Sequence, residues 1–219
     1  MIIDTFMEHI NDPSPIFWCY ACGDREEILS LPAKLTHELG EPATESDISQ
    51  IKKWFGGSAN EFIELYRRLN GFTLYIDTNG YAAGITFYPV DRWLAQTKEM
   101  KKQFKDMGFR QNELPSSTID TLAFAEIPHS GNYFTIKRNG AASGKIFYAD
   151  HDDCVEEPLY DSLSNLLSSI LIDPAKFLNS VGCYTRYSDG NTRTQWIPKE
   201  YVGNFSTNNH LSKPWWKFW

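Results

Sequence analysis

The stretch YRRLNGFTLYI, residues 66–76, ends a predicted helix and begins a predicted strand. Ser58 and Glu61 have the spacing of a capping box, which predicts that the helix begins near residue 58. Apolar side chains then recur on one helical face, at Phe62, Leu65, Tyr66 and Leu69. Asn70-Gly71 is typical of a left-handed helix C-terminus, so the chain turns there directly into the strand.

Further helices follow from the same kind of pattern. Residues 46–55 (SDISQIKKWF) form one helix. Residues 91–108 form another, which we expect Asp91 to cap and Gly108 to end. Its apolar stripe is Trp93, Thr97, Met100, Phe104 and Met107. A last helix has Leu163, Leu166, Leu167 and Ile170 on one face, and Asp173-Pro174 is expected to restart it.

The strands predicted between these helices are joined by short turns. Residues 72–76 and 84–88 make a hairpin, and further strands are expected at 121–127, 132–137 and 145–150. One more hairpin is expected over residues 183–202. Strands joined by short turns pair antiparallel. The sequence therefore predicts an α+β fold, with a mostly antiparallel sheet of about five to six strands packed by helices on one side.

A single domain, residues 1–219, accounts for the chain. We expect its core at about 45–181, a helical extension over 1–44, and a hairpin with an aromatic tail over 183–219. The last residues, KPWWKFW, either fold back over an apolar face or dock onto a partner or a membrane interface. They are too short and too weakly basic to anchor a membrane alone.

Composition narrows the class of protein. The 219 residues are 42% hydrophobic and 15% aromatic, with a formal charge of −7 and a pI of about 5.2. This acidity argues against a nucleic-acid binder, which usually presents a basic face, and suits a basic partner. The N-terminal residues show neither a secretory signal nor a long apolar run, so we expect a cytoplasmic protein with no membrane span.

The stretch FYADHDD, residues 147–153, is the part of the sequence that looks most like a metal-binding or catalytic site. Asp150, His151, Asp152 and Asp153 cannot all converge, because alternate residues of a strand face opposite sides. The pattern of a calcium loop is absent, and the other histidines show no zinc-ligand spacing, so we predict no metal site and no cofactor. With Glu156 and Glu157 the run holds five acids and a histidine. Two interpretations remain, a solvated acidic loop and a loop that contacts a partner.

Other candidate chemistry finds little support. Cys19 and Cys22 form a C-x-x-C, but no thioredoxin-like βαβ setting surrounds them and no second C-x-x-C completes a zinc site. In a reducing compartment we expect free, buried thiols. There is no G-x-S-x-G elbow, no Cys–His signature and no phosphate loop, so we predict no catalytic residues.

The order of these segments resembles the SUKH superfamily. The resemblance rests on YRRLNG running into FTLYI (66–76), on LAFAEIPHSGNYFTIK (122–137), on GKIFYADHDD (144–153) and on YDSLSNLLSSIL (160–171). The group includes fungal cell-wall-assembly regulators and many bacterial immunity proteins. It implies a binding protein that is not an enzyme.

Three functional hypotheses follow. The first is an immunity protein that neutralises a cognate toxin by covering a basic surface. We expect its contacts to come from the loop residues Asp150, His151, Asp152, Asp153, Glu156 and Glu157, and from Asn132 and Tyr133 at a strand end. The second is a regulatory scaffold of the cell-wall-assembly-regulator type with an endogenous partner. The third is a metal-dependent enzyme centred on Asp150 and His151.

Overall fold

The computed structural model describes residues 2–12, 17–22, 28–32, 35–77, 84–110, 113–128, 130–150, 156–174, 177–178, 181 and 194–198. The helices are α1 (Ile2–Ile10), α2 (Glu45–Phe55), α3 (Asn60–Tyr66), α4 (Trp93–Asp106) and α5 (Leu163–Ile172), with 3₁₀ turns η1 (Gly56–Ala59) and η2 (Val90–Arg92). The strands are β1 (Phe17–Cys22), β2 (Ile28–Pro32), β3 (Leu35–Leu39), β4 (Phe72–Asp77), β5 (Ile85–Phe87), β6 (Thr121–Ile127), β7 (Asn132–Lys137), β8 (Ile146–Ala149) and β9 (Thr194–Pro198).

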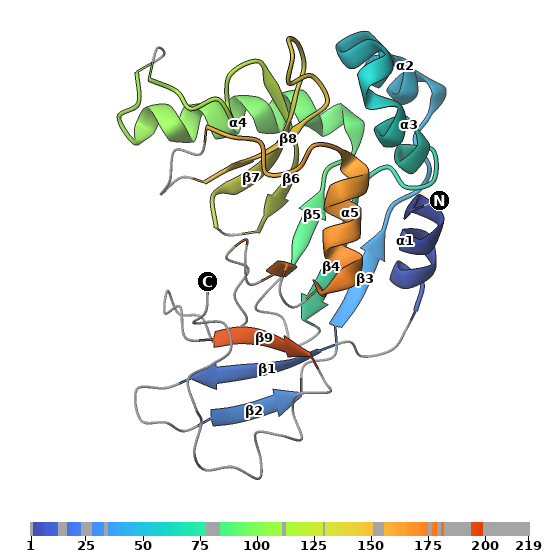
Figure 1. Ribbon diagram of the computed structural model, residues 1–219, viewed down its shortest axis with the longest axis vertical. Helices are drawn as coiled ribbons and strands as arrows, with labels where there is room; N and C mark the ends of the chain where they lie inside the picture. Colours follow the sequence, from blue (N-terminus) through green and yellow to red (C-terminus); the bar gives the residue numbers. More distant parts are fainter. Residues whose placement is uncertain are drawn as a thin grey trace.

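The main sheet confirms the predicted α+β class. Its strands run in the order β3-β4-β5-β6-β7-β8, and every neighbouring pair is antiparallel. The sheet is therefore a meander, in which each strand pairs with the next one along the chain. Figure 1 shows α5 in front of β4 and β5, whereas α4 crosses behind the β6–β8 strands.

Helical cover differs from the expectation of helices on one side. Nearly every position of β6, β7 and β8 is buried, whichever way its side chain points. On one face Phe134 packs against Phe177, just beyond α5. On the other face the Thr97 hydroxyl of α4 accepts a hydrogen bond from Ala123 N at 2.8 Å. This half of the sheet is thus enclosed on both faces.

Aromatic side chains connect the layers of the core. Phe72 and Phe87 stack across β4 and β5 with ring centroids 4.3 Å apart. Trp93 at the start of α4 is fully buried, and its Nε1 donates to the Tyr88 carbonyl at 3.0 Å. Its ring stacks on Trp54 of α2 and meets Phe62 of α3 edge-on. Aromatic side chains in the described part of the chain are therefore largely used in packing.

The helix starts differ from the predicted ones. Ala59 precedes α3 without a side-chain cap, so the Ser58–Glu61 capping box is wrong; residues 56–59 form η1 instead. Asp91 lies inside η2 and does not cap α4. The capping box that does form belongs to α2, where Thr44 and Asp47 exchange hydrogen bonds.

The helix faces are mostly as predicted. The expected faces of the helices beginning near residues 58, 91 and 163 are buried, with one exception. Met107 is 44% exposed, because α4 ends at Asp106 and the chain turns away at Gly108, whose φ is +98°. Beyond α5, Phe177 N donates to Asp173 O at 2.9 Å, the bond expected where a helix restarts.

The Asn70-Gly71 pair is a junction rather than a helix cap. The Asn70 amide accepts a hydrogen bond from Val90 N at 2.9 Å and donates to the Asp47 carboxylate at 3.3 Å. Gly71 has φ +90°, and its carbonyl accepts from Gly40 N at 2.8 Å. The motif thus links the start of α2, the end of β3 and the entrance to α4.

Among the described residues of the extension over 1–44, α1 is the one helix, and the rest includes strands. Strands β1 and β2 pair with each other, and β9 pairs with the other edge of β1, so these strands form a second sheet, drawn below the main one in Figure 1. Residues 194–198 of the predicted hairpin over 183–202 form β9, which pairs with β1. The rest of that hairpin, and the aromatic tail, lie outside the described residues.

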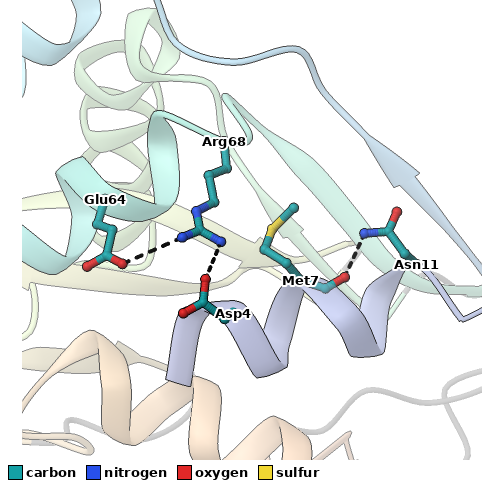
Figure 2. Close-up of polar contacts among 5 residues, drawn as sticks. All are labelled: Asp4, Met7, Asn11, Glu64 and Arg68. Atoms are coloured by element: carbon teal, nitrogen blue, oxygen red, sulfur yellow. Dashed lines mark hydrogen bonds and ion pairs between the residues drawn. The ribbon is translucent and has the colours of Figure 1, made fainter. Parts of the chain in front are cut away.

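Helix α1 is held to α3 by an ion pair on the surface. Figure 2 shows Arg68 between Asp4 of α1, at 2.7 Å, and Glu64 of α3, at 3.8 Å. The Asn11 amide donates to the Met7 carbonyl at the far end of α1. The hydrogen bond from Arg68 lowers the pKa of Asp4. Beneath these polar groups Phe6 packs on Phe72, which fixes α1 against the main sheet.

Candidate functional site

The acidic segment begins where β8 ends. Phe147 and Tyr148 lie in β8 as predicted, and on opposite faces: Phe147 lies beneath the Lys137 ammonium, whereas Tyr148 packs on Phe134. Asp150 is the first residue beyond the strand and is half-buried. Residues 151–155, which include His151, Asp152 and Asp153, lie outside the described residues.

Glu156 anchors the far end of the acidic segment to the rest of the protein. Its carboxylate accepts hydrogen bonds from the backbone N of Ser116, at 3.2 Å, and from the Ser116 hydroxyl. Glu157 is exposed, and Leu159 beside it is 45% exposed. The chain then rejoins the sheet, because Leu159 N donates to Ile146 O at 2.8 Å. An acidic and an apolar side chain are thus presented together on an anchored turn.

The strand-end residues Asn132 and Tyr133 are buried, at 7% and 3% exposure. The Asn132 amide donates to the Tyr148 hydroxyl at 2.9 Å, and that hydroxyl donates to the Val181 carbonyl at 2.6 Å. Burial raises the pKa of Tyr133, and the nearby Glu126 carboxylate adds to this effect. Both residues belong to the packed sheet and offer little surface, so the partner-contact hypothesis depends on the acidic residues.

A cluster that the sequence reasoning missed joins α1 to the edge of the main sheet. The His37 Nδ1 accepts a hydrogen bond from Tyr75 N at 3.0 Å, and His9 Nε2 is hydrogen-bonded to the Tyr75 hydroxyl at 2.9 Å. Burial lowers the pKa of His37 to about 4 and also lowers that of His9. These residues are 28 and 38 positions apart along the chain, so no local spacing pointed to them.

Tyr75 owes its place in this cluster to a backbone irregularity. Its φ is +59°, beside a shift in the β3–β4 register between Thr36 and Glu38. A positive φ is unusual for a bulky residue and is associated with bulges and functional sites. Here it directs the Tyr75 N–H toward His37. The cluster holds two histidines and a tyrosine. These groups form hydrogen bonds, and the histidines can take up protons in mild acid.

Over the part of the chain that the structure describes, no three His, Cys, Asp or Glu side chains are grouped so that they could hold a metal ion. Within that same part, every helix is too short or too polar to cross a bilayer. Cys19 and Cys22 both lie in strand β1, not at the start of a helix as in a thioredoxin-like redox site.

One known protein family matches most of the main sheet and the helices around it. The SMI1 / KNR4 family (SUKH-1) matches residues 42–169, which is more than half of the chain. The match runs from just before α2 to α5 and includes all strands of the main sheet except β3. No curated protein matches the sequence significantly. The chain therefore belongs to the SMI1 / KNR4 family (SUKH-1).

Proposed function

We propose that this protein is a non-enzymatic binding module of the immunity type, which neutralises a protein toxin by covering a basic surface of it. The resemblance to the SUKH superfamily is the ground for a binding role. The choice of surface rests on one observation, the anchored acidic turn. Ser116 is hydrogen-bonded to Glu156 there, and Glu157 and Leu159 are exposed.

Charge and apolar area have separate tasks in such a contact. Carboxylates of the segment from Asp150 to Glu157 would attract a basic surface and speed association. Leu159 would contribute apolar area once water is expelled. With a formal charge of −7, the whole molecule would add to the attraction of a basic partner. A regulatory scaffold with an endogenous partner would use the same surface, so the identity of the partner separates the two roles.

The test is whether a toxin gene lies beside the gene for this protein and, if so, whether the two products bind each other. We expect a complex whose association slows as salt is raised, because exposed charges are screened. Glu157→Lys, and Asp152→Lys with Asp153→Lys, should each slow association about ten-fold or more at low salt. Glu8→Lys makes the same charge change as Glu157→Lys at an exposed position of α1 and is its control.

Two results would contradict the proposal. One is the absence of a toxin gene beside this gene together with an endogenous partner, which would favour the scaffold. The other is a toxin complex that both charge reversals leave as fast and as tight as Glu8→Lys, which would show that the acidic segment is not the contact surface.

A further inference from the structure

A row of polar side chains crosses the main sheet on one face. The strand register places Glu38 of β3 opposite Thr73 of β4, and Thr73 opposite Thr86 of β5. Thr86 in turn lies opposite Glu126 of β6, and Glu126 lies opposite Tyr133 of β7. Directly opposed residues of an antiparallel sheet point to the same face, so these side chains form one continuous row.

This row lies on the face away from α1. Phe72 and Leu74 are the neighbours of Thr73 along β4, and both are buried in the core, Phe72 against Phe6 of α1. Since side chains alternate along a strand, Thr73 points the other way. Glu38 is exposed, and Thr73, Thr86 and Glu126 are half-exposed, so solvent reaches the row from β3 to β6.

Two tyrosines close the inner end of the row beside α4. Tyr88 is 5% exposed, and its hydroxyl has no hydrogen bond of good geometry among the described residues, although Glu126 lies near enough to raise its pKa further than burial alone. The carboxylates of Glu126 and of Glu99 on α4 add to the effect of burial in raising the pKa of Tyr133. The charge of the exposed Arg92 acts to lower the pKa of Tyr88. A buried hydroxyl without a well-formed hydrogen bond thus faces a carboxylate at the end of an open row.

The spacing of the row suggests its ligand. Glu38 and Glu126 are separated by three strand-to-strand steps, which is about 14 Å. In an extended peptide, residues i and i+4 point to the same side and are about 13 Å apart. Two basic side chains four residues apart would therefore meet both carboxylates at once, with the Thr73 and Thr86 hydroxyls, 3.1 Å apart, between them.

We propose that this row binds an extended basic segment of a protein partner, with one arginine at the half-exposed Glu126 and another cation at the exposed Glu38. Arginine suits the inner position because its planar guanidinium can donate two hydrogen bonds to one carboxylate. The inference rests on the proposed role in binding proteins, but it concerns a different surface from the acidic segment that ends at Glu157.

The probe is the peptide acetyl-Arg-Gly-Ser-Gly-Arg-amide, titrated against ¹⁵N-labelled full-length protein. We expect saturable shifts of the backbone amides of Thr86, Glu126 and Tyr133. Glu126→Gln should weaken binding about ten-fold, because a charge-assisted hydrogen bond is lost. Glu38→Gln should weaken it less, and Glu8→Gln on α1, the control for loss of an exposed carboxylate, should leave it unchanged. The peptide with both arginines replaced by glutamine should not bind.

Several outcomes would overturn the inference. One is amide shifts that do not saturate as the peptide is added. Another is equal affinity of the peptide for the wild-type protein and for Glu126→Gln. A third is shifts centred on Glu157, which would favour the acidic segment instead. Spermidine binding as tightly as the peptide would indicate a site for free polyamines. If Glu126→Gln loses its dispersed spectrum, Tyr88→Phe replaces it, and unchanged peptide affinity in that variant counts against the site. A toxin that binds through Glu157 while this peptide does not bind would refute the row alone.

Discussion

The carboxylate of Glu61 on α3 accepts two hydrogen bonds from Ser164 in the first turn of α5, from the backbone N at 2.9 Å and from the hydroxyl at 2.7 Å. Glu61 therefore caps a helix that begins about 100 residues later in the chain. The Ser162 hydroxyl, which accepts from Asn165 N at 3.2 Å, completes the cap. A residue with the spacing of a local capping box instead satisfies one of the free N–H groups of another helix.

Removal of this carboxylate should loosen α5. We expect Glu61→Ala to lower the free energy of unfolding by about 1–2 kcal/mol, since one cap and one half-buried hydrogen bond are lost. Glu61→Gln retains an acceptor and should cost less. Urea denaturation followed by fluorescence measures both, with Glu8→Gln on α1 as the control for loss of a surface charge. Equal stability of Glu61→Ala and wild type would show that the cap contributes nothing.

Gly71 should be far less replaceable than Gly57. A Cβ at Gly71 would lie 2.8 Å from Pro89 Cδ and 2.9 Å from Pro89 N, in a backbone conformation with φ +90°. We expect Gly71→Ala to cost at least about 2 kcal/mol. Gly57 in η1 has open space around its Cα, so Gly57→Ala should change stability by less than about 1 kcal/mol. Thermal unfolding of the pair would check this, and a similar effect of both substitutions would contradict the geometry.

His37 should make the fold sensitive to mild acid. Its pKa is lowered from 6.5 to about 4, chiefly by burial and then by the nearby His9, so the folded state favours the neutral ring. The stability that depends on the neutral ring is complete above pH 6.5 and is lost as the pH falls from 6.5 toward 4. Protonation of Nδ1 would also break the hydrogen bond from Tyr75 N.

His37→Asn separates this effect from general acid denaturation. Asparagine retains an acceptor for the Tyr75 N–H but does not titrate, so the variant should lose less stability than wild type between pH 6.5 and 4. Denaturant midpoints measured across this range give the comparison. Parallel curves for the two proteins would mean that His37 does not titrate with folding.

Asn132 and Tyr148 should affect stability before they affect binding. Tyr148→Phe removes the hydroxyl that links the Asn132 amide to the Val181 carbonyl, and we expect a loss of about 1–3 kcal/mol. Asn132→Ala should cost a similar amount. The charge reversal Glu157→Lys, in contrast, should leave the unfolding curve nearly unchanged. If Asn132→Ala unfolds like wild type yet weakens partner binding, the residue has the contact role first expected of it.

Much of the fold could be predicted because its signals are local. Short connections join β4 to β5, β6 to β7 and β7 to β8, so these neighbours in sequence became neighbours in the sheet, whereas α4 lies between β5 and β6. The helix faces ending at Leu69 and Phe104 followed from a period of 3.6 residues. The helix starts at Ser58 and Asp91 were wrong, because a cap depends on where the first turn of the helix lies and not only on spacing.

The candidate site was predicted less completely. Asp150, Glu156 and Glu157 could be found because acids in a run are visible in any sequence. The hydrogen bonds from Ser116 to Glu156 could not be predicted, since the two residues are 40 positions apart. The same reason hides the cluster of His9, His37 and Tyr75.

The sequence by itself determined the α+β class, the antiparallel order of neighbouring strands and the family, because these depend on periodic apolar patterns and turns within short stretches. Only the tertiary structure decided that Glu61 serves α5, that β9 joins β1, and that Glu38 and Glu126 share one face of the sheet. Each of these depends on strand register or helix packing between distant segments, and the energy of such contacts exists only once the chain has folded.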